Sequence, residues 1–180
     1  NDIRGWAISP MYQNGPLKLG ASLQQRKTHE PIAGNTDQNK RTSWELGGSY
    51  DFGVVKLSAM YGQARDKDAN AVAGAEAKIR QYFLGASVPV FTNGAVLASY
   101  GHSKNHADSA NDAAATQWAL GYNHFLSKRT NIYAAYSDIS NKDGRRVSGI
   151  DQGLGAATGD ASYGGTGYQR GFQVGIKHAF

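Results

Sequence analysis

The chain has 180 residues, of which 40% are hydrophobic and 18% are charged, with a formal net charge of +5 and a mean hydropathy of −0.52. This length predicts one domain, and no apolar run approaches the ~20 residues that a membrane-spanning helix needs. A helical membrane bundle is therefore excluded. A transmembrane β-barrel is not excluded, because alternating strands average out in any hydropathy window.

The residue types favour an all-β chain with many turns. There are 23 Gly and 10 Tyr but only 4 Pro. Cysteine is absent, so neither a disulfide framework nor a thiolate metal site is expected. Because the chain opens at Asn1 without an initiator Met or a signal-peptide core, we expect a mature or truncated product.

Apolar side chains alternate with small or polar ones through nine successive segments, which is the pattern of strands with one apolar face. In chain order the apolar positions run over Trp6–Tyr12, Leu17–Leu23, Trp44–Phe52, Val55–Tyr61, Tyr82–Val88, Val96–Tyr100, Trp118–Tyr122, Ile132–Tyr136 and Phe172–Phe180. Four positions break the pattern, with Pro10 outward and Phe83, Leu97 and Tyr133 inward.

Short and long connections alternate along the chain. Short turns are expected near residues 14, 53, 93 and 128, and long polar loops at about 28–41, 66–76, 105–115 and 140–167. This asymmetry is typical of outer-membrane barrels, which have short periplasmic turns and long extracellular loops. A soluble sandwich has no reason to show it.

The last ten residues, Gly-Phe-Gln-Val-Gly-Ile-Lys-His-Ala-Phe, place aromatic and apolar side chains on one face and end on Phe180. This ending resembles the closing strand of general porins of the Gram-negative outer membrane, especially the beta-proteobacterial type. The segment from Tyr122 to Tyr136 is similar to the penultimate hairpin of that family.

The resemblance implies a transmembrane antiparallel up-and-down β-barrel of sixteen strands, of which this chain supplies the nine C-terminal ones as a single domain, 1–180. The amino-terminal half, with the constricting third loop, is then absent from this sequence. The resemblance also implies a passive water-filled channel for small hydrophilic solutes and ions, a homotrimer, contact with lipid and lipopolysaccharide, and no cofactor. Phe180 is expected to serve as the assembly signal.

Aromatic side chains gather near both ends of the expected strands, where amphipathic rings prefer the membrane interface. These girdle residues are Trp6, Tyr12, Trp44, Tyr50, Phe52, Tyr61, Tyr82, Tyr100, Trp118, Tyr122, Tyr136 and Phe180.

The opposite face is expected to line the pore. Its lining residues are Lys18, Gln24, Arg26, Glu45, Asp51, Lys56 and Lys177. Because cations outnumber anions there, four to two, a modest preference for anions is expected.

Four other interpretations fit the sequence less well. An outer-membrane lipase or protease would need a nucleophile and a base together, yet His102 and Ser103, adjacent in a strand, point to opposite faces, and His106 with Asp108 lacks a third group. His102 and His106 stand about 13 Å apart on a strand, too far to chelate one metal ion.

A soluble lipocalin-like binding barrel would have a polar outer face. The positive charge suggests nucleic acid, but the cations are scattered through turns and loops, and most charges are expected on the face opposite the aromatics.

Overall fold

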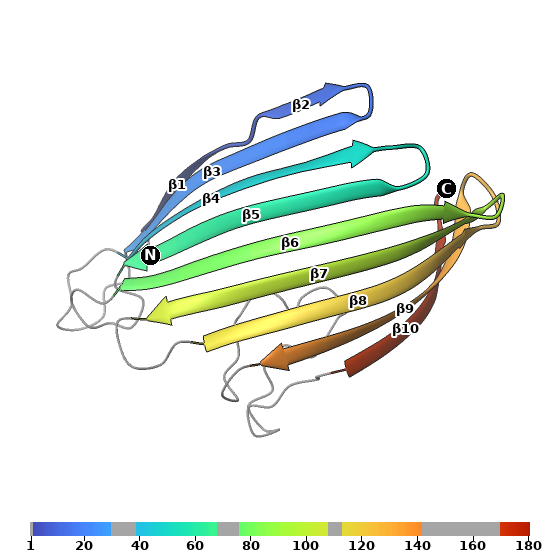
Figure 1. Ribbon diagram of the computed structural model, residues 1–180. Helices are drawn as coiled ribbons and strands as arrows, with labels where there is room; N and C mark the ends of the chain where they lie inside the picture. Colours follow the sequence, from blue (N-terminus) through green and yellow to red (C-terminus); the bar gives the residue numbers. More distant parts are fainter. Residues whose placement is uncertain (1, 30–38, 68–75, 108–112, 142–169) are drawn as a thin grey trace.

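The computed structural model describes residues 2–29, 39–67, 76–107, 113–141 and 170–180. In this part of the chain ten strands form one antiparallel sheet, in which consecutive strands from β2 to β10 are paired and β1 pairs with β3 (Figure 1). The strands are β1 (Asp2–Ile8), β2 (Met11–Asn14), β3 (Leu17–His29), β4 (Asn39–Asp51), β5 (Lys56–Lys67), β6 (Glu76–Val90), β7 (Gly94–Ala107), β8 (Ala113–Phe125), β9 (Thr130–Asn141) and β10 (Arg170–His178). The predicted all-β, antiparallel meander is confirmed.

The first predicted strand is interrupted. β1 and β2 both pair with β3, and the break between them falls at Ser9 and Pro10. Proline has no N–H to donate to a ladder, so it is confined to edges and bulges. Its carbonyl still accepts a bond from the Ala21 N–H at 3.1 Å. Nine crossings of the sheet were therefore predicted correctly, but one crossing consists of two strands.

The predicted long loops were wrong in their bounds, because the strands extend further than the apolar alternation. β5 and β6, for example, stay paired through Lys67 and Glu76, and β3 and β4 through Thr28 and Asn39. A barrel strand needs about 9–11 residues to cross the hydrocarbon layer, whereas β3 and β4 have 13 each and β6 has 15. Backbone bonds continue where the side chains have become polar, so hydropathy alone ends each strand too early.

All the short connections lie at one end of the sheet, together with the C-terminus (Figure 1). The first is a two-residue hairpin loop, Gly15 and Pro16, because Asn14 and Leu17 are still paired. Gly15 has a φ of 54°, which a II′ hairpin requires at its first central position and which glycine adopts without strain. The strand ends joined by the long connections lie at the opposite end of the sheet, as the alternation of short and long connections predicted.

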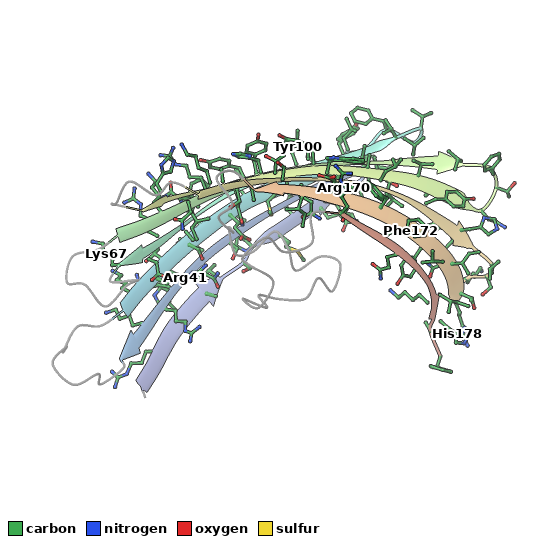
Figure 2. The ribbon with its side chains drawn as sticks, turned by 90° about the horizontal axis from the view of Figure 1, so that it is seen from below. Arg41, Lys67, Tyr100, Arg170, Phe172 and His178 are labelled. Carbon is green, nitrogen blue, oxygen red and sulfur yellow. The ribbon has the colours of Figure 1, made fainter. Side chains whose placement is uncertain are left out.

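The sheet has no apolar interior. Within the described residues the buried hydrophobic side chains are just Ala114, Ala115 and Ile139, while large apolar side chains such as Leu46 and Leu84 are 58% and 51% exposed. The sheet is a single curved layer, and Figure 2 shows Tyr100 on its convex side. No helix in the described part of the chain is long and apolar enough to cross a membrane.

Candidate channel wall and its membrane-facing belt

The antiparallel register assigns every strand residue to one of two faces, because directly opposed residues share a face and successive residues alternate. Trp44, Tyr61 and Tyr100 lie on the same face, which is convex (Figure 2). Arg41, three residues before Trp44, therefore lies on the concave face. All apolar alternation described above falls on the convex side.

A continuous row of aromatic rings crosses the convex face, toward the strand ends that the long connections join. Six consecutive strands, β4 to β9, contribute one ring each, and neighbouring rings touch in pairs. The ring centroids are 5.5 Å apart for Trp44 and Tyr61, 6.1 Å for Tyr82 and Tyr100, and 5.4 Å for Trp118 and Tyr136. Trp6 stands beside this row, one position further toward the same end, because its partner Gln25 is opposed to Thr42 rather than to Trp44.

The second group of predicted girdle residues is less continuous. Tyr50 and Phe52 are in contact, with centroids 4.5 Å apart. Tyr12 is paired with Leu19 of β3, and Tyr50 is paired with Leu17, the adjacent residue on the same face of β3. Tyr122 lies on β8, where its hydroxyl is 3.1 Å from His124 Nδ1. Phe180 follows the end of β10 and meets the His178 ring edge-on at 5.0 Å.

The seven predicted pore-lining residues all lie on the concave face by register. The structure adds two charged residues that the sequence interpretation had assigned to loops, Arg41 and Asp66. Their alternation signal was hidden because both lie outside the apolar runs of their strands, Arg41 before Trp44 and Asp66 after Tyr61. On this face the charged strand residues are five cations, Lys18, Arg26, Arg41, Lys56 and Lys177, and three anions, Glu45, Asp51 and Asp66.

Each of these three carboxylates has a partner. Asp66 Oδ2 lies 4.0 Å from Arg41 Nη1, and Glu45 Oε1 accepts a bond from Gln81 Nε2 at 3.3 Å. Asp51 Oδ1 accepts the backbone N–H of Gly53 at 2.8 Å, which ties it to the turn after β4. The concave face is thus a polar wall on which cations exceed anions by two, five against three.

The expectation that most charges lie opposite the aromatics was wrong. Three adjacent rows on the convex face, at and beyond Trp44 toward the long connections, carry eight cations, which we call the basic belt. The belt consists of Arg4, Lys27, Lys40, Arg65, Lys67, Lys78, Arg80 and Lys104. The described part of these rows includes one acidic position, Glu76. The strands continue past the apolar band, and their alternate residues stay on the convex face. Cations that the sequence placed in or near loops therefore lie on this face.

The residues considered for chemistry do not form a site. His102 Nδ1 is 2.9 Å from Thr116 Oγ1 and its ring lies 5.4 Å from Tyr82, whereas Ser103 is on the other face. His106 lies on the convex face opposite Lys78. Asp108 lies outside the described residues. Among the described residues no group of three or more potential metal ligands is present.

The comparisons with known proteins show the family of the chain. The sequence model of the Gram-negative porin family matches residues 1–144. The chain belongs to the Gram-negative porin family. Outer membrane porin protein 32 of Delftia acidovorans is 40% identical to this porin over 174 residues, which are 94% of the chain and 44% of that protein.

Solved porins share the fold. The anion-selective porin from Comamonas acidovorans matches with a TM-score of 0.75 and 34% identity, over 98% of this chain and 49% of that one. An outer membrane protein of Vibrio cholerae, OmpT in its trimer form, matches with a TM-score of 0.67 at 16% identity, over 77% of this chain and 46% of that one, which shows the fold alone. This porin chain spans less than half the length of the curated relatives it matches, 44% and 42%.

Family membership decides between the interpretations left open by the sequence. Porins are channels rather than enzymes, so the lipase or protease alternative is set aside. The soluble lipocalin-like alternative also fails, because the solved relatives are porins and the exposed apolar band lies on the convex side of this sheet.

Proposed function

We propose that this chain forms about half of the wall of a water-filled channel in the outer membrane of a Gram-negative bacterium, through which small hydrophilic solutes and ions diffuse passively. The observation that carries the proposal is the segregation of the two faces. The convex face is an exposed apolar band bordered by aromatic rings, as a lipid-facing surface is, and the concave face is polar and charged. No cofactor or catalytic group is needed, because transport runs down a gradient.

The channel is proposed to be completed by further strands. In the described residues the sheet order runs from β1 to β10 without joining its ends. An open edge within lipid leaves backbone N–H and C=O groups unpaired, at several kcal/mol each. We propose that this chain is the C-terminal part of a sixteen-stranded barrel, whose remaining strands pair with β10 and with the edge formed by β1 and β2.

An anion preference is proposed for the channel. It is supported by the excess of two cations on the concave face and by the anion-selective character named for the Comamonas acidovorans relative. Fixed charges on a confined wall raise the local concentration of counter-ions more than the same charges on an open surface.

Lipopolysaccharide is proposed as a partner of the convex face. The basic belt stands where the phosphates of a lipid headgroup layer would meet the wall, at and just beyond the aromatic row. Long Lys and Arg stems can lie along apolar surface and keep their charge in the headgroup region. A homotrimer is proposed as well, supported by the trimer form named for the Vibrio cholerae protein of the same fold.

The test is reconstitution of the full-length protein into planar bilayers. We expect stepwise chloride and potassium conductance that is ohmic at low voltage, together with leakage of small sugars from proteoliposomes. Proteoliposomes containing heat-denatured protein are the control. Absence of conductance from folded protein would contradict the channel.

A further inference from the structure

Several large apolar side chains interrupt the polar concave face. Met60, Phe83, Leu97 and Tyr133 lie on β5, β6, β7 and β9, and Met60 is directly opposed to Phe83. Phe83 and Leu97 remain 38% and 42% exposed. Apolar surface on the wall of an aqueous channel is unfavourable, and the diffusion of small ions does not require it.

The two aromatic rings of this set, Phe83 and Tyr133, lie in space that neighbouring glycines leave open. A Cβ added at Gly85 would lie 3.1 Å from Phe83 Cε1, and one at Gly175 would lie 2.5 Å from Tyr133 Cζ. Each ring thus occupies the space that a side chain would take beside it, on its own strand or on the next. The Tyr133 hydroxyl also accepts a bond from Gln173 Nε2 at 3.1 Å. Both rings are therefore positioned along the wall rather than extended across the lumen.

Between the rings the wall is hollowed into a groove of about 650 Å³. This size falls within the ~300–1,000 Å³ of small-molecule sites. Its side-chain lining combines the apolar groups Phe83, Leu97 and Tyr133 with the polar groups Lys56, Asn123 and Asn131. The two asparagines are joined by a hydrogen bond from Asn131 Nδ2 to Asn123 Oδ1.

The charge of the groove selects one class of occupant. Lys56 is the charged residue of its lining. Its directly opposed neighbour Asp51 lies outside that lining and accepts the Gly53 N–H. Lys177 is directly opposed to Asn131. The concave face thus offers cationic groups beside an apolar floor, which complements a carboxylate attached to a flat hydrocarbon body. A sugar has no large apolar surface to place on the apolar floor. An organic cation would be repelled by the Lys56 ammonium.

We propose that this groove is a weak binding subsite for aromatic carboxylates passing through the channel. The proposal rests on the channel function proposed above. The carboxylate is placed near the Lys56 ammonium, and the ring is placed on Leu97 on the side toward Phe83. Asn123, Asn131 and Tyr133, on β8 and β9, line the further part of the groove. Weak binding suits a conducting pathway, since a solute must enter readily and also leave.

The experiment measures chloride current through the full-length protein in planar bilayers while benzoate or acetate is added. We expect benzoate to reduce the chloride current in a saturable manner, and acetate, which lacks the ring, to do so much more weakly. An aromatic contact contributes about 0.5–1.5 kcal/mol beyond area burial, so Phe83→Ala should raise the half-blocking benzoate concentration by about two- to tenfold. Lys56→Gln should raise it as well, and should remove the preference for benzoate over neutral benzyl alcohol.

Matched controls separate the groove from general effects. Leu84→Ala removes an apolar side chain from the next position, on the convex face, and Lys18→Gln removes a concave-face cation outside the groove lining. Leu84→Ala should leave the benzoate half-block unchanged, and Lys18→Gln should shift it much less than Lys56→Gln. Phe83→Leu keeps an apolar side chain beside Gly85 and should give a smaller shift than Phe83→Ala. Heat-dependent migration on electrophoresis, compared with and without heating, reports correct folding of each variant.

Two results would overturn the inference. Equal block by benzoate and acetate in a conducting channel would show that the groove does not bind the ring, including the case in which another part of the full-length protein fills it. Equal shifts for Phe83→Ala and Leu84→Ala would place the benzoate site elsewhere. A protein that conducts no chloride would instead contradict the proposed channel itself.

Discussion

Arg41 and Asp66 are directly opposed on β4 and β5, and their charged groups lie 4.0 Å apart on the concave face. Arg26 is the partner of Arg41 on the other side, so one row carries two guanidinium groups and one carboxylate. Asp66→Asn removes the carboxylate and leaves both cations, so we expect a stronger anion preference. Arg41→Gln should weaken it. The zero-current potential of the full-length channel under a salt gradient measures both, and changes of the same sign would contradict the assignment.

Charge reversal at the other end of the wall should act in the opposite direction. Lys56→Glu with Lys177→Glu changes the described concave face from two more cations than anions to two more anions than cations. We expect the anion preference to fall or invert. Lys128→Glu with Arg129→Glu, in the exposed turn between β8 and β9, is the control and should have less effect. An unshifted zero-current potential in the Lys56 and Lys177 double variant would show that these residues do not face the ion path.

The two faces of β6 should respond differently to the same new side chain. Leu84→Arg places a cation in the convex apolar band, where the cost is about 2–4 kcal/mol at the bilayer midplane. Gln81→Arg, on the concave face of the same strand, keeps a donor toward Glu45 and should cost less than about 1 kcal/mol. Urea unfolding of each full-length variant in lipid vesicles measures the difference. Equal destabilisation would mean that the faces are assigned wrongly.

The C-terminal residue should matter more for assembly than its aromatic neighbour. Phe180 lies past the last strand with its side chain fully exposed, while His178 Nδ1 lies 2.8 Å from Thr130 Oγ1 on β9. We expect deletion of Phe180 to prevent accumulation of folded protein in the outer membrane, and His178→Ala to reduce it slightly. Cell fractionation followed by electrophoresis without heating compares the two. Normal outer-membrane levels of the deletion would remove the assembly role.

Neutralising part of the basic belt should weaken lipopolysaccharide binding without changing ion selectivity. Each Lys or Arg near an anionic surface contributes about 1 kcal/mol. Replacing Arg65, Lys78, Arg80 and Lys104 with Gln should therefore lower affinity by more than about tenfold. Lipopolysaccharide retained by the purified protein, titrated by calorimetry after delipidation, is the measurement. Retained affinity in this variant, or equal loss in Lys18→Gln with Lys56→Gln on the concave face, would refute the role of the belt.

Several features were determined by the sequence alone. The period of two fixes which side chains share a face, and the aromatic positions at the ends of the apolar runs mark the limits of the apolar band. The face of every predicted pore-lining residue, from Lys18 to Lys177, follows from this parity. Short turns such as the one at Gly15 were also legible, because few residues adopt the backbone conformations that tight hairpins require.

Strand length and register were decided by the tertiary structure. The ladder is held by backbone hydrogen bonds, which do not depend on side-chain polarity, so β5 and β6 remain paired out to Lys67 and Glu76 where hydropathy predicted a loop. The basic belt exists only because of this extension. Likewise, Phe83 and Tyr133 were exceptions in the alternation, and their meaning depended on which glycines the register placed beside them. Such neighbours belong to positions distant along the chain, and only strand pairing brings them together.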